Sequence, residues 1–246
     1  MTLSSDLKKF VKEVGFIDCG ITNPESVNHL YYDWIGKIRK MSRPVEEFPI
    51  TKSIIIMIQE VWDNSFNLSI YPSEWKGYGM HPKGEKFESY YIGYEIMRRK
   101  AQNVVDYLQE KGYRSKITYA IPLKTTAVAS GLGAQGKNTL FIHPLKGPRV
   151  MIVGILTEAE LDIDKSYDDD MCGDCQKCVD ACPTGALEPY RLTHQRCMTY
   201  SAESPCSIDV PEEVREKAKT YIKRPTSNSF IDCSICVNIC PLGKRN

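Results

Sequence analysis

Residues 172–183 read CGDCQKCVDACP and residues 233–241 read CSICVNICP, and these two runs decide the fold of the last third of the chain. Nine of the ten cysteines lie between positions 172 and 240. Within each run, short loops let several thiolates converge on one inorganic cluster, and a proline after the last cysteine ends the local turn. The last cysteine of each run can therefore point toward a second cluster.

This spacing is the ligand pattern of a protein with two [4Fe–4S] clusters. Two clusters need eight thiolates and the two runs supply seven, so the eighth comes from Cys197 or Cys206. A zinc site needs no crossing cysteine, and a disulfide framework is typical of short secreted chains. We predict a first cluster on Cys172, Cys175, Cys178 and Cys240, and a second on Cys182, Cys233, Cys236 and, as the first choice for the last position, Cys197.

The bulk composition excludes several other classes of protein. A chain of 246 residues forms one mid-sized domain and an appendage. The formal net charge is +1, so no general basic field exists and nucleic acid is not expected as a partner. The longest apolar run, residues 54–58, is too short for a membrane, and the N-terminus resembles no export signal. Because iron–sulfur thiolates favour a reducing interior, we expect a cytoplasmic protein.

Hydrophobic periodicity predicts a layered α/β region before the cysteines begin. Helices are expected from residue 3 to a stop at Gly15 and over residues 88–111. Residues 54–58 are all apolar, which predicts a strand buried on both faces. Further strands are predicted at 16–21, 117–123 and 149–157, and a long loop at 63–87. We expect two domains, 1–165 and 166–246.

Residues 131–139, GLGAQGKNT, match two nucleotide-binding patterns but lack their context. A dinucleotide fingerprint follows a strand and opens a helix, whereas a helical stretch precedes this turn and an extended one follows it. A P-loop needs Ser or Thr after its lysine, and this chain has Asn138. NAD and ATP are therefore not expected. Two interpretations stay open. The glycines, which have no side chains, allow a large ligand to approach the backbone closely, or they form a tight structural turn.

The string AVASGLGAQGKNTLFIHP at 127–144, the run CGDCQKCVDACPTGAL at 172–187 and RCMTY at 196–200 resemble epoxyqueuosine reductases and reductive dehalogenases. The resemblance implies an α+β protein: a nitroreductase-like α/β sandwich domain followed by a bacterial-type two-[4Fe-4S] ferredoxin domain. It also implies a base-off cobalamin that receives electrons from the clusters, a small-molecule substrate, and a ferredoxin or flavodoxin as the electron donor. The similarity at 196–200 favours Cys197 as the eighth thiolate.

The resemblance also implies the residues of the site. Cobalamin contacts are expected from the glycine turn and from one residue near Cys197. They are Ser130, Gly131, Gly133, Gln135, Gly136, Lys137, Asn138 and Thr199. The aspartate proton donor of epoxyqueuosine reductases has no counterpart in residues 117–121. Tyr119 is the first choice to replace it, with Lys124 and Arg149 as electrostatic helpers. The alternative is that Tyr119 is a half-buried strand residue.

Three functions follow from these residues. The first is a cobalamin-dependent iron–sulfur oxidoreductase that performs reductive cleavage or elimination. The second is a two-cluster electron carrier or reductive activator of another corrinoid protein, which the missing aspartate and the absence of a C-terminal helical extension favour. The third is a flavin in the same α/β domain. The sequence leaves the substrate open.

Overall fold

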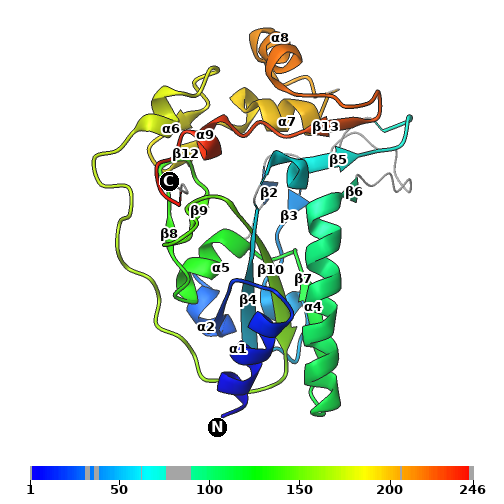
Figure 1. Ribbon diagram of the computed structural model, residues 1–246, viewed down its shortest axis with the longest axis vertical. Coiled ribbons are helices and arrows are strands. Elements are labelled where there is room, and N and C mark those ends of the chain that lie inside the picture. Colours follow the sequence, from blue (N-terminus) through cyan, green and yellow to red (C-terminus); the bar gives the residue numbers. More distant parts are fainter. Residues whose placement is uncertain are drawn as a thin grey trace.

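The centre of the molecule is a four-stranded sheet of order β1-β4-β10-β7 (Figure 1), in which all neighbouring strands are antiparallel. The structure is a computed structural model that describes residues 2–30, 34–35, 39–61, 63–75, 90–205 and 207–243. The strands of the sheet are β1 Asp18–Thr22, β4 Ser53–Glu60, β7 Ser115–Thr118 and β10 Val150–Thr157. The strands predicted near residues 16–21, 54–58 and 149–157 are confirmed.

Strand β4 is buried on both faces, as its unbroken apolar run predicts. Alternate side chains of residues 54–58 enter two separate hydrophobic cores, because successive strand residues point to opposite faces. In the first core Ile55 lies opposite Ile21 of β1 and Ile155 of β10, and Ile155 lies opposite Ile117 of β7. This row of isoleucines crosses the whole sheet, which fixes the strand register.

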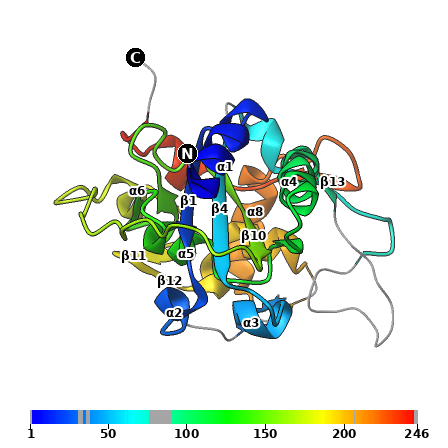
Figure 2. The ribbon, with the colours of Figure 1, turned by 90° about the horizontal axis from the view of Figure 1, so that it is seen from below.

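Helices cover both faces of the sheet. The first core packs under α1 Leu3–Glu13 and α4 Ile92–Glu110, and the second packs under α2 Pro24–Val27 and α5 Leu123–Ala129. Strands β4 and β10 lie between α4 and α5 (Figure 2). Gly15 and Gly112 follow the ends of α1 and α4 with φ of +93° and +88°, the left-handed conformation that commonly ends helices. Both predicted helix stops are therefore confirmed.

Three predicted boundaries are wrong. Helix α4 begins at Ile92 and not at residue 88, because β6 Tyr90–Tyr91 pairs with β5 Leu68–Ile70. That pairing also replaces part of the predicted loop, whose residues 76–87 lie outside the described residues. The strand predicted over 117–123 ends at Thr118. Pro122 then precedes α5, since a proline presets the first helical turn and needs no amide partner.

The cysteine-bearing part lies at one end of the central sheet (Figure 1). Its three-stranded sheet has the order β13-β5-β6, with β13 Ser229–Ile231 paired to β5. Its helices are α6 Lys177–Asp180, α7 Met198–Glu203, α8 Glu212–Tyr221 and α9 Ile235–Asn238, with the 3-10 turn η2 His194–Arg196. Trp75 and Phe230 share a third core with residues of α7 and α8. The segment around β5 thus packs with the C-terminal part.

Short elements complete the fold. They are the hairpins β2 Trp34–Ile35 with β3 Arg39–Lys40, β8 Ala134–Gln135 with β9 Phe141–Ile142, and β11 Leu187–Glu188 with β12 Arg191–Leu192, the helix α3 Pro44–Glu47 and the 3-10 turn η1 Asn64–Asn67. In the described part of the chain, no helix has both the length and the apolar character to cross a bilayer.

Candidate functional site

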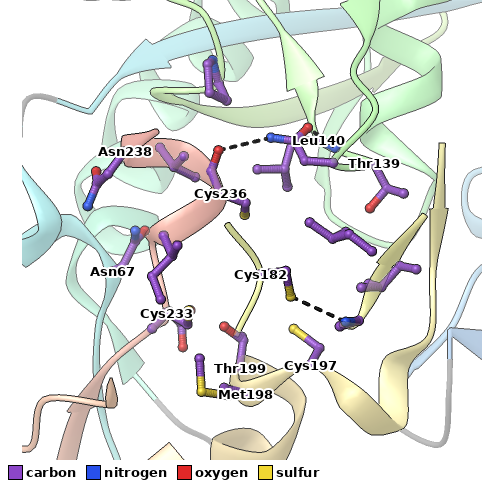
Figure 3. A pocket seen from close by; sticks show the side chains of 18 of the residues that line it. Asn67, Thr139, Leu140, Cys182, Cys197, Met198, Thr199, Cys233, Cys236 and Asn238 are labelled. Carbon is purple, nitrogen blue, oxygen red and sulfur yellow. Dashed lines mark hydrogen bonds between the residues drawn. The ribbon is translucent and has the colours of Figure 1, made fainter. Parts of the chain in front are cut away.

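Two neighbouring cavities are each lined by four cysteines. The smaller has a volume of about 60 Å³ and is lined by Cys172, Cys175, Cys178 and Cys240. The larger has a volume of about 600 Å³ and is lined by Cys182, Cys197, Cys233 and Cys236 (Figure 3). The structure therefore brings together the same two sets of thiols that the spacing predicts. Cys206 lies outside the described residues.

The thiols surround spaces larger than a single ion. Among the described residues, no three His, Cys, Asp or Glu side chains are close enough to share one metal ion. Each set of four thiols instead lines a cavity wall, which is the arrangement that a cube of four irons and four sulfides requires. The donor set thus fits one [4Fe–4S] cluster in each cavity.

Local hydrogen bonds position the first run of cysteines. Asp170 accepts the backbone N–H of Cys172 at 2.9 Å, and the carbonyl of Cys172 accepts the N–H of Cys175 at 2.9 Å. Gly173 between them has φ of +47°, a conformation that favours glycine. The loop therefore curls around the smaller cavity.

Hydrogen bonds to Cys182 distinguish this thiol from others of the second set. Burial raises the pKa of the Cys236 thiol to about 12. Burial also raises the pKa of Cys182, but the Thr184 hydroxyl at 3.6 Å and the Ala186 N–H at 3.3 Å outweigh it and lower the pKa overall. Because a metal binds the thiolate, cluster assembly must release the protons that burial holds on these thiols.

The wall of the larger cavity also carries charged groups. Lys124 at the start of α5 is accessible through the cavity, and its ammonium donates one long hydrogen bond of 3.4 Å to the carbonyl of Thr139. Desolvation beside the cavity lowers the pKa of Lys124. Lys124 thus lies on the wall of the larger cavity, and its predicted electrostatic role stays a prediction.

Two carboxyl groups near this wall were missed by the sequence analysis. Asp232 lines the larger cavity, and its buried Oδ1 has no hydrogen-bond partner among the described residues. Burial, and then the charge of Glu203, raise its pKa well above the usual value. Glu203 accepts the Tyr91 hydroxyl at 2.7 Å, and burial raises its pKa as well. No sequence pattern marks either residue, because their burial depends on β6, α7 and β13 meeting.

Arg149 lines the larger cavity and also has a structural role. Its guanidinium donates to the carbonyls of Leu242 at 2.7 Å, Val237 at 2.9 Å and Cys240 at 3.0 Å. These bonds hold the end of α9 and the segment after it, and with them one cysteine of the smaller cavity. The predicted electrostatic role of Arg149 toward a substrate stays a prediction.

Tyr119 does not line either cavity, and its predicted role as a proton donor stays a prediction. It packs in the first core beside Ile117, and its ring meets Tyr94 of α4 edge-on at 5.5 Å between centroids. Tyr119 follows the end of β7 and is half-buried against α4.

Most of the glycine turn lies away from the two cavities. Ser130, Gly131, Gly133, Gln135 and Gly136 do not line either cavity. A Cβ on Gly131, which has φ of +79°, would lie 2.5 Å from the carbonyl oxygen of residue 165. The glycines thus let the turn pack against the chain's own backbone, and their predicted contacts with a cobalamin stay a prediction.

The last residues of the predicted cobalamin set do reach the cavities. Asn138 and Thr199 line the larger one. The Lys137 backbone N–H donates to the Cys172 sulfur at 3.4 Å, and its ammonium donates to the Gly173 carbonyl at 2.5 Å. Lys137 therefore contacts the loop around the smaller cavity.

Comparison with known proteins finds a family match in the C-terminal part. Residues 171–243 match the model of the 4Fe-4S double cluster binding domain. This range contains both cysteine runs and Cys197. A two-cluster [4Fe–4S] domain is thus supported independently of the cavities.

Curated relatives are epoxyqueuosine reductases. The chain is 31% identical to the enzyme of Bacillus subtilis over 157 residues, covering 61% of this chain and 38% of that protein. It is 26% identical to the enzyme of Pseudomonas aeruginosa over 264 residues, covering 97% of this chain and 68% of that protein. The chain thus spans between about a third and two thirds of these relatives' length. The resemblance seen in the sequence is confirmed.

Solved structures confirm the fold. A selenomethionine-labelled epoxyqueuosine reductase matches with a TM-score of 0.69 at 24% identity, covering 98% of this chain and 65% of that one. A reductive dehalogenase, described with a mechanism for B12-dependent dehalogenation, matches with a TM-score of 0.55 at 16% identity, covering 94% and 35%. The predicted α+β class, with a nitroreductase-like sandwich and a two-cluster domain, is therefore correct.

One further structure corrects an expectation about partners. It is an epoxyqueuosine reductase with an epoxyqueuosine-modified tRNA stem loop, with a TM-score of 0.69, 23% identity and coverage of 98% of this chain and 65% of that one. A relative of this fold thus binds RNA. This finding weighs against the expectation, based on net charge, that nucleic acid is not a partner.

Proposed function

We propose that the chain is an iron–sulfur oxidoreductase that uses a base-off cobalamin for reductive cleavage or elimination at a carbon–heteroatom bond. The observation that carries this proposal is the larger cavity. It has about ten times the volume of the smaller one, 600 Å³ against 60 Å³, although four cysteines line each. The larger cavity thus extends beyond the space that one cube needs, and we propose that part of a corrinoid and the substrate occupy this extension.

The wall of the larger cavity has the chemistry to hold a corrinoid. A corrin ring is apolar on its faces and carries carboxamide groups around its edge. Amide and hydroxyl side chains line the cavity at Asn67, Thr139, Thr199 and Asn238, between apolar residues such as Leu140 and Met198 (Figure 3). Asn138 also lines it. We propose that the polar groups hold the edge and the apolar ones a face. When bound, the corrinoid supplies the low-potential chemistry at its metal, with electrons from the clusters.

Lys124 is the residue that we propose to act on the substrate. A reductive cleavage takes up two electrons and one proton, breaks a carbon–heteroatom bond, forms a carbon–hydrogen bond and releases the heteroatom as an anion. Among the described residues, no ion pair within 4.0 Å involves the Lys124 ammonium, although the charge of Glu203 acts on it, and its one hydrogen bond is long at 3.4 Å. This cation is therefore placed to hold the departing anion.

The two sets of thiols define the path that we propose for electrons. The cysteines of the smaller cavity are the ligands of the first cluster, and those of the larger cavity the ligands of the second. Cys172 and Cys175 are partly accessible and adjoin the exposed Gly173 and Asp174, whereas the second set faces the larger cavity. Electrons from a ferredoxin or flavodoxin thus enter at the first cluster. This chemistry needs a reducing compartment, so we propose the cytoplasm.

The substrate class is proposed from the relatives. Because solved epoxyqueuosine reductases of this fold include one with a modified tRNA stem loop, an epoxide carbon–oxygen bond in a nucleoside is the first substrate to test. A small organic halide is the second, since the fold is shared with reductive dehalogenases. Incubating the reduced protein with each and analysing the product by mass spectrometry separates the two.

The metal content tests the proposal directly. Protein reconstituted without oxygen and supplied with hydroxocobalamin is expected to contain about eight irons and one cobalt per chain, with the visible spectrum of a base-off corrinoid. Lys124→Met should retain both cofactors but lose most product formation. Lys165→Met is the matched control, because that side chain is exposed and far from the wall.

An iron-replete protein that takes up no cobalamin would overturn the corrinoid part of the proposal. The electron-carrier alternative would then be tested by reduction of the cobalt of a separate corrinoid protein. A yellow preparation that releases flavin on denaturation would instead support a flavin in the α/β domain.

A further inference from the structure

Two consecutive residues at the tip of the glycine turn contact different cysteine loops. The backbone N–H of Lys137 donates to the Cys172 sulfur at 3.4 Å. The side-chain amide of the next residue, Asn138, donates to the Cys236 carbonyl at 3.4 Å. Cys172 belongs to the smaller cavity and Cys236 to the larger. One short piece of chain thus joins loops that are distant in the sequence.

Asn138 lies between the two cavities. Among the described residues, it alone lines both of them. The side chain is buried, with 4% of its surface exposed. Any charge placed on this side chain would therefore act on both cavities at short range.

The turn holds Asn138 in a defined position. Its Oδ1 accepts the backbone N–H of Leu140 at 3.1 Å, and a Cβ on Gly136 would lie 2.8 Å from that oxygen. Thr139, which follows, has φ of +61°, a conformation that costs a non-glycine residue energy. The carbonyl of Gly136 accepts the Thr139 N–H at 2.8 Å. Neighbouring Cα atoms are about 3.8 Å apart, so this rigid tip sets a fixed spacing between its two contacts.

We infer that Lys137 and Asn138 are positioning residues that fix the separation and electronic coupling of the two clusters. The inference rests on the iron–sulfur part of the proposed function and not on the corrinoid. Lys137 supplies an N–H···S bond to a ligand of the first cluster, and such bonds tune cluster potentials. Asn138 ties the second cluster's loop to the same rigid tip. In the step concerned, one electron leaves the reduced first cluster and reduces the second.

A matched pair of substitutions tests the position of Asn138. Asn138→Asp places a negative charge between the cavities, and Asn238→Asp places the same charge on the wall of the larger cavity only. Asn238 is more exposed than Asn138, and its native amide donates to the hydroxyl of Ser234, the residue before α9, at 3.0 Å. Potentiometric titration followed by EPR is expected to show both midpoint potentials lowered in Asn138→Asp and only one lowered in Asn238→Asp.

A third variant tests the spacing itself. Two reduced clusters at short separation broaden each other's EPR signals by magnetic interaction. Asn138→Leu has similar bulk and no amide, so we expect full iron content with an altered interaction spectrum. Iron-replete Asn138→Leu with the wild-type spectrum would overturn the inference, as would Asn138→Asp that shifts one potential or neither. Loss of iron from both Asn138 variants would overturn it too, because the residue would then serve assembly and not spacing.

The iron and cobalt contents of the wild-type protein, measured first, distinguish failure of the corrinoid proposal from failure of this inference. A chain with about eight irons and no cobalt removes the corrinoid proposal and leaves this inference open to the same EPR test. A chain without paired clusters removes both.

Discussion

At the scale of single residues, hydrogen bonds to sulfur and buried carboxyl groups distinguish this site. The two bonds to Cys182, from Thr184 and Ala186, stabilise its thiolate against the effect of burial. Glu203 lies in surroundings that favour the neutral acid. Thr184 and Glu203 each support a prediction that can be tested without knowing the substrate.

Thr184→Val is expected to lower the midpoint potential of the second cluster by a few tens of millivolts. The hydroxyl stabilises negative charge on the sulfur, and the reduced cluster carries more of it than the oxidised cluster does. Redox titration followed by EPR measures the change, with Thr184→Ser as the control that keeps the hydroxyl. An unchanged potential in iron-replete Thr184→Val would contradict the role of this bond.

Glu203→Gln is expected to make the protein more stable than the wild type as the pH rises. Burial raises the folded pKa of Glu203 above its usual 4.5. The folded protein thus holds the proton more tightly than the unfolded chain, and this contribution to stability is lost as the pH rises through the folded pKa. Glutamine keeps an acceptor for Tyr91 but cannot ionise.

Thermal unfolding followed by circular dichroism between about pH 5 and pH 8 tests this linkage. The melting temperature of Glu203→Gln minus that of the wild type should increase as the pH rises over this range. The same difference for the exposed control Glu160→Gln should stay constant. Parallel curves for Glu203→Gln and wild type would show that Glu203 has its ordinary pKa.

At the scale of elements, the glycine turn between α5 and β9 connects the sheet domain to both cysteine loops. Its glycines allow close packing against the turn's own chain, and its tip, Lys137 and Asn138, contacts the two sites. The tip of this turn thus contacts the loops that carry the cysteines of both cavities.

Gly131→Ala is expected to destabilise the protein clearly more than Gly112→Ala. Both glycines have left-handed φ, +79° and +88°, so each alanine costs about 1–2 kcal/mol in conformation. Gly112 has open space around it, whereas a Cβ at Gly131 meets the carbonyl of residue 165 at 2.5 Å. Unfolding by denaturant measures both, and equal losses would show that this packing contact contributes nothing.

At the scale of the whole molecule, the two parts are stabilised differently. The central sheet buries isoleucine-rich cores that need no metal. The C-terminal part has a smaller third core and two cavities lined by thiols. We propose a division into domains 1–165 and 166–246, with the segment 68–75 packed on the second.

Removal of iron is expected to unfold the second domain, while the first domain stays folded. After oxidation and chelation, hydrogen exchange should become fast across residues 171–243 and also in β5, because β5 pairs with β13. Strands β4 and β10 should stay protected, since their partners are apolar and close. Mass spectrometry of exchanged peptides measures this, and uniform loss of protection would indicate one cooperative unit.

The sequence alone determined the buried strand, both helix stops and the grouping of cysteines around two cavities, because these depend on local spacing and periodicity. Only the tertiary structure decided which face Tyr119 occupies, what Arg149 holds, and that Glu203 and Asp232 are buried together. Those outcomes depend on contacts between segments far apart in the chain. The position of a residue in the periodic pattern determines its neighbours along its own helix or strand. Its tertiary surroundings depend on which other elements pack against that helix or strand.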